Sequence, residues 1–233
     1  MPEFARCPLL MTATIAPKPQ PGLTLDNPLV RWAQYRKSII FWLSQPLVDL
    51  VIFAENSQFP VDYGPLLELA HRMKKSLEII PVPPTNRPGK ALGETHIMRH
   101  VLATTPLIRH ARSFYKVTGR IQVRNFSRIA RHLNTTPTAF ARRHYRTPQW
   151  ADTRFFKVDP EFLAKVCLPL PIENSHAILG QIYGPTLHLH KIPSLWPYPQ
   201  YAGCSAGTGQ TYHIPRWKSV VKTALAIAGG FDL

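Results

Sequence analysis

The sequence predicts an α/β domain in which helices flank a mostly parallel sheet. Short apolar runs at 49–54, 77–82 and 113–117 alternate with segments that have the apolar periodicity of helices. Nearly continuous apolar runs are typical of strands buried on both faces, and their alternation with helices is typical of a parallel sheet. The length of 233 residues fits a single domain, and 45% of the residues are apolar, which is enough for a hydrophobic core.

Helix boundaries can be placed from capping residues and prolines. Asn27 followed by Pro28 is a typical helix start, and it predicts a helix that ends at Leu43, before Gln45-Pro46. A fourth strand is expected at 153–158. Further helices are predicted at 63–76, 92–103, 125–133, 160–166 and 215–228. A short helix that ends at Ala111 is also predicted, after the break at Thr105-Pro106.

The N-terminal segment has a different composition from the rest of the chain. Residues 1–27 are rich in proline and have no periodic apolar face. This pattern predicts a flexible tail before a domain that spans residues 28–233.

The charge balance narrows the class of partner. The chain has 28 Lys and Arg against 13 Asp and Glu, a net charge of +15, which favours phosphates, other polyanions or anionic lipid heads. No nucleic-acid motif accompanies this charge, so we do not expect nucleic acid as the partner. The alternative interpretation is a basic nucleic-acid-binding or membrane-surface module without catalysis, which binds any polyanion in a salt-sensitive way.

Cysteine and histidine usage predicts neither a disulfide framework nor a metal site. The three cysteines have no recognisable spacing, and His188-Leu189-His190 has no third ligand close in sequence. No segment is apolar for long enough to span a bilayer. We therefore expect a cytoplasmic protein, with the inner membrane surface as a second location.

Polar residues cluster where the predicted strands end and where one loop enters a helix. In open α/β sheets, ligands bind outside the carboxyl ends of the strands. Basic side chains there suit phosphate, because arginine offers a planar fork of donors and helix N-termini favour anions. The predicted binding residues are Glu55, Asn56, Ser57, Lys90, Lys116, Thr118, Gly119 and Arg120.

Few carboxylates are available as a catalytic base. Those beside predicted strand ends or loops are Glu55, Glu94, Asp152 and Glu173. Transfer to a hydroxyl group needs a group that takes its proton. Asp152 and Glu173 are the predicted catalytic residues, and a salt bridge or a helix cap is the alternative role for each.

Four segments occur in an order that resembles a known group of proteins. They are Val51–Ser57, Gly89–Glu94, Phe114–Arg120 and Asp152–Phe156, and the likeness spans most of residues 29 to 210. Together they resemble bacterial proteins of surface-polysaccharide synthesis that are regarded as GT-A-like glycosyltransferases. The resemblance implies a single Rossmann-like, GT-A-like domain, a nucleotide-sugar donor and a glycan or lipid-linked acceptor. It implies no catalytic residue.

The sequence departs from the wider GT-A pattern in one respect. It has no DxD motif, the pair of aspartates that commonly holds a divalent metal against the nucleotide diphosphate. The third predicted strand instead has Lys116 and Arg120 near its end, and such side chains can neutralise a departing diphosphate directly. We therefore expect a metal-independent glycosyltransferase that requires no cofactor besides its nucleotide-sugar donor.

Overall fold

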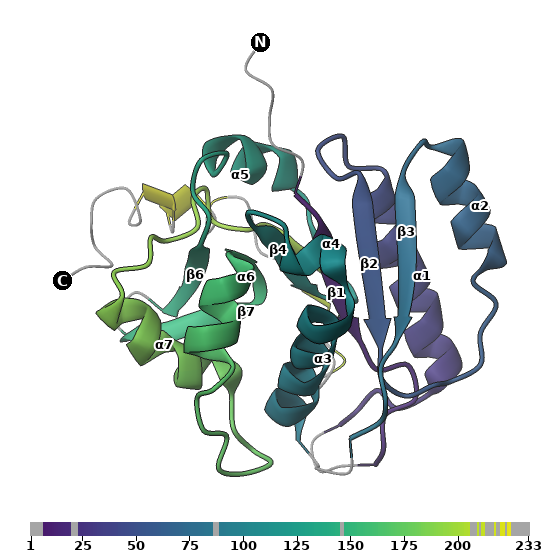
Figure 1. Ribbon diagram of the computed structural model, residues 1–233, viewed down its shortest axis with the longest axis horizontal. Helices are drawn as coiled ribbons and strands as arrows, with labels where there is room; N and C mark the ends of the chain where they lie inside the picture. The colour runs from purple at the N-terminus through teal and green to yellow at the C-terminus, as the bar shows by residue number, and fades with distance from the viewer. Residues whose placement is uncertain are drawn as a thin grey trace.

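A six-stranded sheet with helices on both faces forms the centre of the computed structural model (Figure 1). The structure describes residues 7–19, 23–85, 89–144 and 147–205, together with 209, 211, 212, 217, 220, 221, 223 and 224; at 142–144 and 147–149 it describes the backbone alone. The strands of this sheet are, in spatial order, β3 (Ser76–Pro81), β2 (Leu50–Glu55), β1 (Leu9–Ala13), β4 (Phe114–Thr118), β7 (Thr147–Val158) and β6 (Ala139–His144).

The predicted fold class is confirmed. Strands β3, β2, β1 and β4 are parallel to one another, whereas β7 pairs antiparallel with both β4 and β6. The remaining described elements are helices and a two-stranded sheet of β5 and β8. They are α1 (Pro28–Leu43), α2 (Gly64–Arg72), α3 (Lys90–Thr104), α4 (Pro106–Arg109), β5 (Ile121–Val123), α5 (Phe126–His132), α6 (Pro160–Phe162), the π-helix η1 (Leu163–Cys167), α7 (Leu179–Leu189) and β8 (Tyr201–Gly203).

The interpretation of residues 1–27 as a flexible tail is wrong for residues 9–13. This segment is strand β1, which lies between β2 and β4 and pairs with both. Its five residues, Leu-Leu-Met-Thr-Ala, are all buried. A strand that is buried on both faces and hydrogen-bonded on both edges needs only a short apolar run. Because this run is surrounded by prolines, the composition of the whole segment does not indicate a strand.

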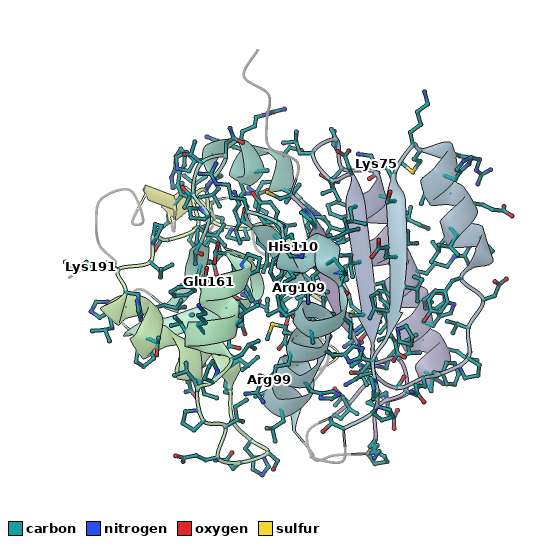
Figure 2. All side chains as sticks on the ribbon, viewed as in Figure 1. Lys75, Arg99, Arg109, His110, Glu161 and Lys191 are labelled. Atoms are coloured by element: carbon teal, nitrogen blue, oxygen red, sulfur yellow. The ribbon has the colours of Figure 1, made fainter. Side chains whose placement is uncertain are left out.

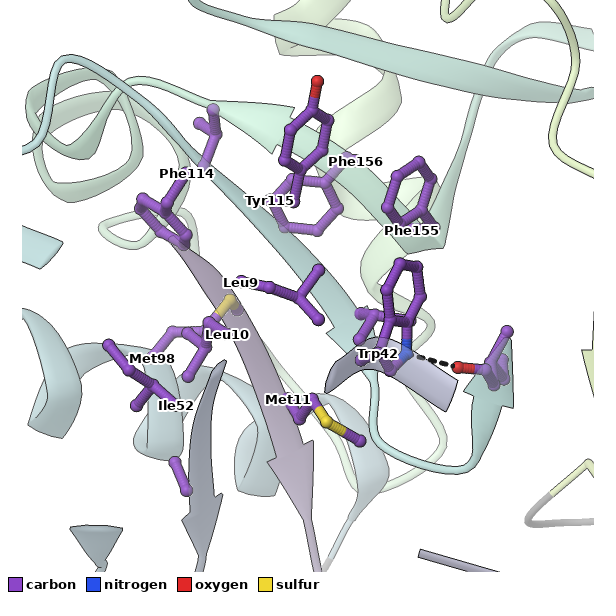
Figure 3. Packing of buried hydrophobic residues seen from close by; sticks show 14 of the residues in the cluster. Leu9, Leu10, Met11, Trp42, Ile52, Met98, Phe114, Tyr115, Phe155 and Phe156 are labelled. Carbon is purple, nitrogen blue, oxygen red and sulfur yellow. Dashed lines mark hydrogen bonds between the residues drawn. The ribbon is translucent and has the colours of Figure 1, made fainter. Parts of the chain in front are cut away.

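The core fills both faces of the sheet, because successive side chains of a buried strand point to opposite faces. Phe53 faces α1, where its ring meets Tyr35 at a centroid distance of 5.6 Å. Figure 3 shows Met98 of α3 with Leu10 and Ile52 in the same core cluster. Trp42 donates a hydrogen bond from Nε1 to the carbonyl of Ile121, which fixes α1 against β5.

Several predicted boundaries differ from the observed ones. The helix predicted at 63–76 ends at Arg72, because Lys74 adopts a left-handed conformation with φ of 53° and β3 begins at Ser76. The strand predicted at 153–158 is the second half of the longer β7. The helix predicted at 215–228 lies mostly outside the described residues. Strands β5, β6 and β8 and helix α7 have no counterpart among the predicted elements.

The described helices can also be compared with the thickness of a bilayer. None of them combines the length and the apolar character that crossing a membrane requires.

Candidate functional site

The order of the strands creates a point where the chain changes direction across the sheet. From β1 the chain passes through α1 to β2 and then through α2 to β3, moving away from β4. It returns through α3 to β4, on the other side of β1. Helices α1 and α3 therefore lie on opposite faces (Figure 1), and the carboxyl ends of β1 and β4 lie between them. In α/β folds, ligands bind at this switch point.

The ends of β1 and β4 are in direct contact. The peptide N–H of Gly119 donates a hydrogen bond of 2.9 Å to the carbonyl of Thr12. A Cβ atom at position 119 would lie 2.8 Å from that same oxygen and 2.8 Å from a ring carbon of Tyr35. Glycine is therefore required here by close packing rather than by its conformational freedom.

Glu55, Asn56 and Ser57 hold the loop that follows β1. The Glu55 carboxylate accepts hydrogen bonds from the backbone N–H groups of Ile15 (2.9 Å), Ser57 and Gln58. Asn56 Oδ1 accepts one from the hydroxyl of Thr14 at 2.6 Å, and Ser57 Oγ accepts one from the N–H of Ala16. These contacts shape the loop beside the switch point. The predicted contact of the three side chains with a nucleoside stays a prediction.

Arg120, two residues after the end of β4, has an incompletely satisfied guanidinium group. Its side chain is only 2% exposed; Nη1 donates to Gln34 Oε1 at 2.8 Å, and Nη2 is buried without a hydrogen-bond partner among the described residues. The group lies 5.7 Å from the centre of the Tyr35 ring. Burial, together with the nearby positive charge of Arg31, lowers the pKa of Arg120 below its ordinary value.

Arg31 is a second buried guanidinium beside the first. It is 4% exposed and donates to backbone carbonyls, from Nε and Nη2 to Thr14 and from Nη1 to Leu25. Its Nη2 also lies 3.4 Å from the hydroxyl of Tyr35. Within the described part of the chain, neither Arg31 nor Arg120 forms an ion pair with a carboxylate. Two buried positive charges without a counter-ion are costly, and an anionic ligand would compensate them.

Lys116 lies on the other face of β4 and is fully buried. Its ammonium group pairs with Glu94 of α3, donates to the carbonyl of Thr153 at 2.8 Å, and lies 3.3 Å from the hydroxyl of Thr118. Burial lowers the pKa of Lys116, and the Glu94 carboxylate opposes this effect. The charge of Lys116 is thus compensated within the protein by Glu94. A diphosphate that contacts Lys116, as predicted, would have to share the ammonium group with Glu94.

The carboxylate of Glu94 is held at the switch point by three side chains. Besides Lys116, the hydroxyl groups of Thr12 and Thr118 each lie 3.4 Å from Oε1. All of these contacts involve Oε1. The second oxygen, Oε2, makes no hydrogen bond with any described residue and is not one of the fully buried unpaired atoms.

Lys90 begins α3 at the same edge of the sheet. Its side chain is exposed, and it lies one helical turn before Glu94, on the same face of the helix. The preceding Gly89 has a φ of 123°, and a Cβ atom there would lie 2.8 Å from the backbone of Ser175. The loop that carries Glu173 therefore packs against the start of α3. Glu173 itself is exposed.

Asp152 is buried within β7 and has its own partners. Arg154 Nε donates to Asp152 Oδ1 at 2.8 Å, Arg154 Nη2 pairs with Oδ2, and the hydroxyl of Tyr198 lies 3.4 Å from Oδ2. The guanidinium of Arg154 stacks on Tyr201 at 4.1 Å and on Tyr212 at 5.0 Å. Burial would raise the pKa of Asp152, but Arg154 lowers it below its ordinary value. Both oxygens of this predicted base are thus engaged in a buried ion pair.

The structure brings most of the predicted residues to one edge of the sheet. Lys90, Lys116, Thr118, Gly119 and Arg120 surround the ends of β1 and β4, and Glu55, Asn56 and Ser57 follow the neighbouring β2. Asp152 lies on the neighbouring strand β7, whose antiparallel pairing with β4 brings it near the same edge.

Sequence reasoning did not identify Arg31, Gln34 or Tyr35 as site residues. They share the inward side of α1 at the spacing i, i+3 and i+4, a pattern that could have indicated them.

No family model and no curated protein sequence matches the chain. Among solved structures, the chain is similar to a candidate glucose-1-phosphate thymidylyltransferase from Bacillus anthracis, solved in complex with a sucrose, with 11% identity and a TM-score of 0.48. The similarity covers 95% of this chain and 94% of that chain. A likeness at this level assigns no role to any residue of this chain.

Proposed function

We propose that this protein is a glycosyltransferase that uses a nucleotide-sugar donor and transfers the sugar to a glycan or a lipid-linked acceptor in surface-polysaccharide synthesis. The observation that supports this proposal best is the pair of buried guanidinium groups of Arg31 and Arg120. They lie at the switch point, have no carboxylate partner in the described part of the chain, and leave Arg120 Nη2 without a hydrogen bond.

The donor's diphosphate is the group that this pair of arginines suits. Its negative charges would compensate both guanidinium groups, and Arg120 Nη2 would donate to a phosphate oxygen. When the sugar leaves, the nucleoside diphosphate gains charge, and fixed positive groups stabilise that charge in the transition state. Lys90, which is exposed at the start of α3, would add a third positive group on the opposite face of the sheet. In this proposal the reaction needs no metal ion.

The other predicted residues have supporting roles in the proposal. Glu55, Asn56 and Ser57 fix the loop after β1, which would form one wall of the nucleoside site. Asp152 and Glu173 remain predictions for the base that activates the acceptor.

Isothermal titration with nucleotides tests the donor site. The chain is titrated with UDP, GDP, dTDP and CMP, each with and without EDTA. We expect one of the diphosphates to bind saturably and to the same extent in EDTA. If none binds, the proposed function is wrong; if EDTA abolishes binding, its metal-free form is wrong.

Two matched variants locate the site within the chain. Arg120→Met should lose at least ten-fold in affinity, since one good charged hydrogen bond contributes about 1.5–3 kcal/mol. Arg128→Met changes an exposed arginine on α5, at the opposite edge of the sheet, and should bind like the wild type. Equal losses in both variants would indicate a nonspecific effect of charge.

A module that binds polyanions without catalysis is the second candidate. Basic side chains also lie far from the switch point, for example Lys75 before β3, Arg109 on α4 and Lys191 after α7 (Figure 2). This function predicts binding to DNA or to anionic vesicles that weakens steeply with salt, and no saturable binding of nucleotides. The same titrations, repeated at two salt concentrations, distinguish the two candidates.

A further inference from the structure

We infer that Glu94 is the base that takes the proton from the acceptor's hydroxyl group. This inference rests on the proposed function and supplies the carboxylate that the sequence did not single out. The described carboxylates near the carboxyl edge differ in whether they have an oxygen without a protein partner, which a substrate could then contact.

Two of these carboxylates are fully engaged within the protein. Glu55 accepts backbone hydrogen bonds on both oxygens, from Ile15 and Ser57 on Oε1 and from Gln58 on Oε2. Asp152 accepts from Arg154 on both oxygens. Each of them shapes the protein around it, and neither has an oxygen without a protein partner.

Glu173 and Glu94 remain, and they differ in how firmly they are held. Glu173 is exposed in a loop, and no described contact orients its side chain. Glu94 is 9% exposed and is oriented through Oε1 by Lys116, Thr12 and Thr118, which come from the two strands that form the switch point. Its Oε2 has no protein partner among the described residues. A base must be held in place and must keep one oxygen for the reacting proton, and Glu94 meets both conditions.

Lys116 is the ion-pair partner of the Glu94 carboxylate. Its ammonium group is completely buried, and its three donors are directed at Glu94, Thr118 and the carbonyl of Thr153. Lys116 therefore acts through Glu94, as a positioning residue that balances its charge. Arg31 and Arg120 lie on the opposite face of the same strand ends, so a donor that extends from them across the carboxyl edge of the sheet would carry its sugar toward Glu94.

The reaction balances with these groups alone. The acceptor oxygen forms a bond to the anomeric carbon of the sugar, and the bond from that carbon to the donor phosphate oxygen breaks. The electron pair of the broken bond goes to the nucleoside diphosphate, beside Arg120 and Arg31. The proton of the acceptor hydroxyl goes to Glu94 Oε2.

Turnover of the donor in water tests the inference without a known acceptor. The nucleotide found by titration is supplied as its sugar conjugates, and release of the nucleoside diphosphate is followed for the wild type, Glu94→Gln, Asp152→Asn and Glu173→Gln. General-base catalysis contributes about 10²–10⁴-fold, so Glu94→Gln should lose that factor while it binds the nucleoside diphosphate as the wild type does. Glu68→Gln, which changes an exposed carboxylate on α2, is the control and should keep its rate. A loss of this size in Asp152→Asn or Glu173→Gln, with Glu94→Gln unchanged, would assign the base to that residue and overturn the inference.

Sodium azide separates the loss of a base from a structural defect. Azide needs no deprotonation before it attacks the anomeric carbon, so it should restore turnover in Glu94→Gln and give a glycosyl azide that mass spectrometry detects. If Glu94→Gln does not fold, Glu94→Gln combined with Lys116→Met removes both charges of the pair and replaces it in the assay.

The outcomes separate the inference from the proposed function. Unchanged turnover in Glu94→Gln, or a lost rate that azide does not restore in a variant that still binds nucleotide, overturns the role of Glu94 alone. A wild-type chain that binds no nucleotide overturns the proposed function and this role with it.

Discussion

The N–H of Gly119 and the carbonyl of Thr12 form a 2.9 Å hydrogen bond that joins the end of β4 to the end of β1. The two arginines lie on one side of this bond and the Glu94 carboxylate on the other. The position has no room for a side chain, because a Cβ atom there would approach Thr12 O and the Tyr35 ring to 2.8 Å.

Gly119→Ala should therefore destabilise the protein by about 1–3 kcal/mol, the usual result of adding a group to a filled site. Gly93→Ala is the control, because its Cβ atom would meet only the side chain of Asn56, at 3.8 Å, and alanine favours a helix. Urea unfolding measures both. Equal stability of Gly119→Ala and the wild type would mean that β1 and β4 can separate at this point.

Arg120 should be a position where binding and stability conflict. Arg120→Met removes a buried positive charge that no carboxylate of the described residues balances, so its free energy of unfolding should equal or exceed that of the wild type. Arg31→Met is the matched comparison. It removes the Nη1 donor to the carbonyl of Leu25 and two donors to that of Thr14, which keeps the Tyr35 hydroxyl, and should lose about 1–3 kcal/mol.

Urea unfolding without ligand compares the two variants directly. A large loss of stability in Arg120→Met would show that Arg120 serves mainly to hold the fold together. In that case the unpaired Nη2 would no longer support an anion site.

The architecture could be predicted from sequence where a local pattern decides it. Asn27 and Pro28 place the start of α1 correctly, and its end at Leu43 also agrees with the prediction. The apolar runs of β2 and β4 are recognisable for the same reason, since both strands are buried on both faces. These features depend on residues close in sequence.

The rest depends on partners that are distant in the chain. Strand β1 is a strand because β2 and β4 lie on either side of it, and residues 9–13 alone do not reveal this. In the same way, the sequence around Glu94 indicates only a helix residue. Its distinguishing contacts at Oε1 come from Lys116 and Thr12, which are 22 and 82 positions away. For Asp152 the error is the reverse. The sequence suggests a free carboxylate that could act as a base, but in the structure Arg154 and Tyr198 contact this carboxylate.

The central place of β1 can be tested by mutation. Leu10→Ala should lose about 2–5 kcal/mol, because Leu10 is 1% exposed and packs in the core cluster that also contains Met98. Lys18→Ala, in the exposed segment after β1, should change little. A chain that starts at Pro28, the predicted domain boundary, should not fold, and a cooperative unfolding transition of that chain would contradict the role of β1.

Asp152 should give the stability of the protein a specific dependence on pH. Its pKa in the folded state lies below the ordinary value of 3.8, because Arg154 outweighs the effect of burial. Folding therefore favours the deprotonated form. The carboxylate contributes its stabilisation in full above the unfolded-state pKa, and this contribution is lost as the pH falls through the lower folded-state pKa.

Asp152→Asn should consequently be less stable than the wild type at pH 7, by about 3–5 kcal/mol, since it leaves Arg154 half-buried without its counter-ion. The difference should shrink as the pH falls below 3.8, where the wild-type carboxylate also becomes protonated. Glu68→Gln, on the exposed side of α2, serves as the control and should follow the wild type throughout. Thermal unfolding from pH 7 to pH 2 measures all three. A difference that stays constant over this range would mean that the charge of Asp152 contributes nothing and that its side chain acts through packing and neutral hydrogen bonds.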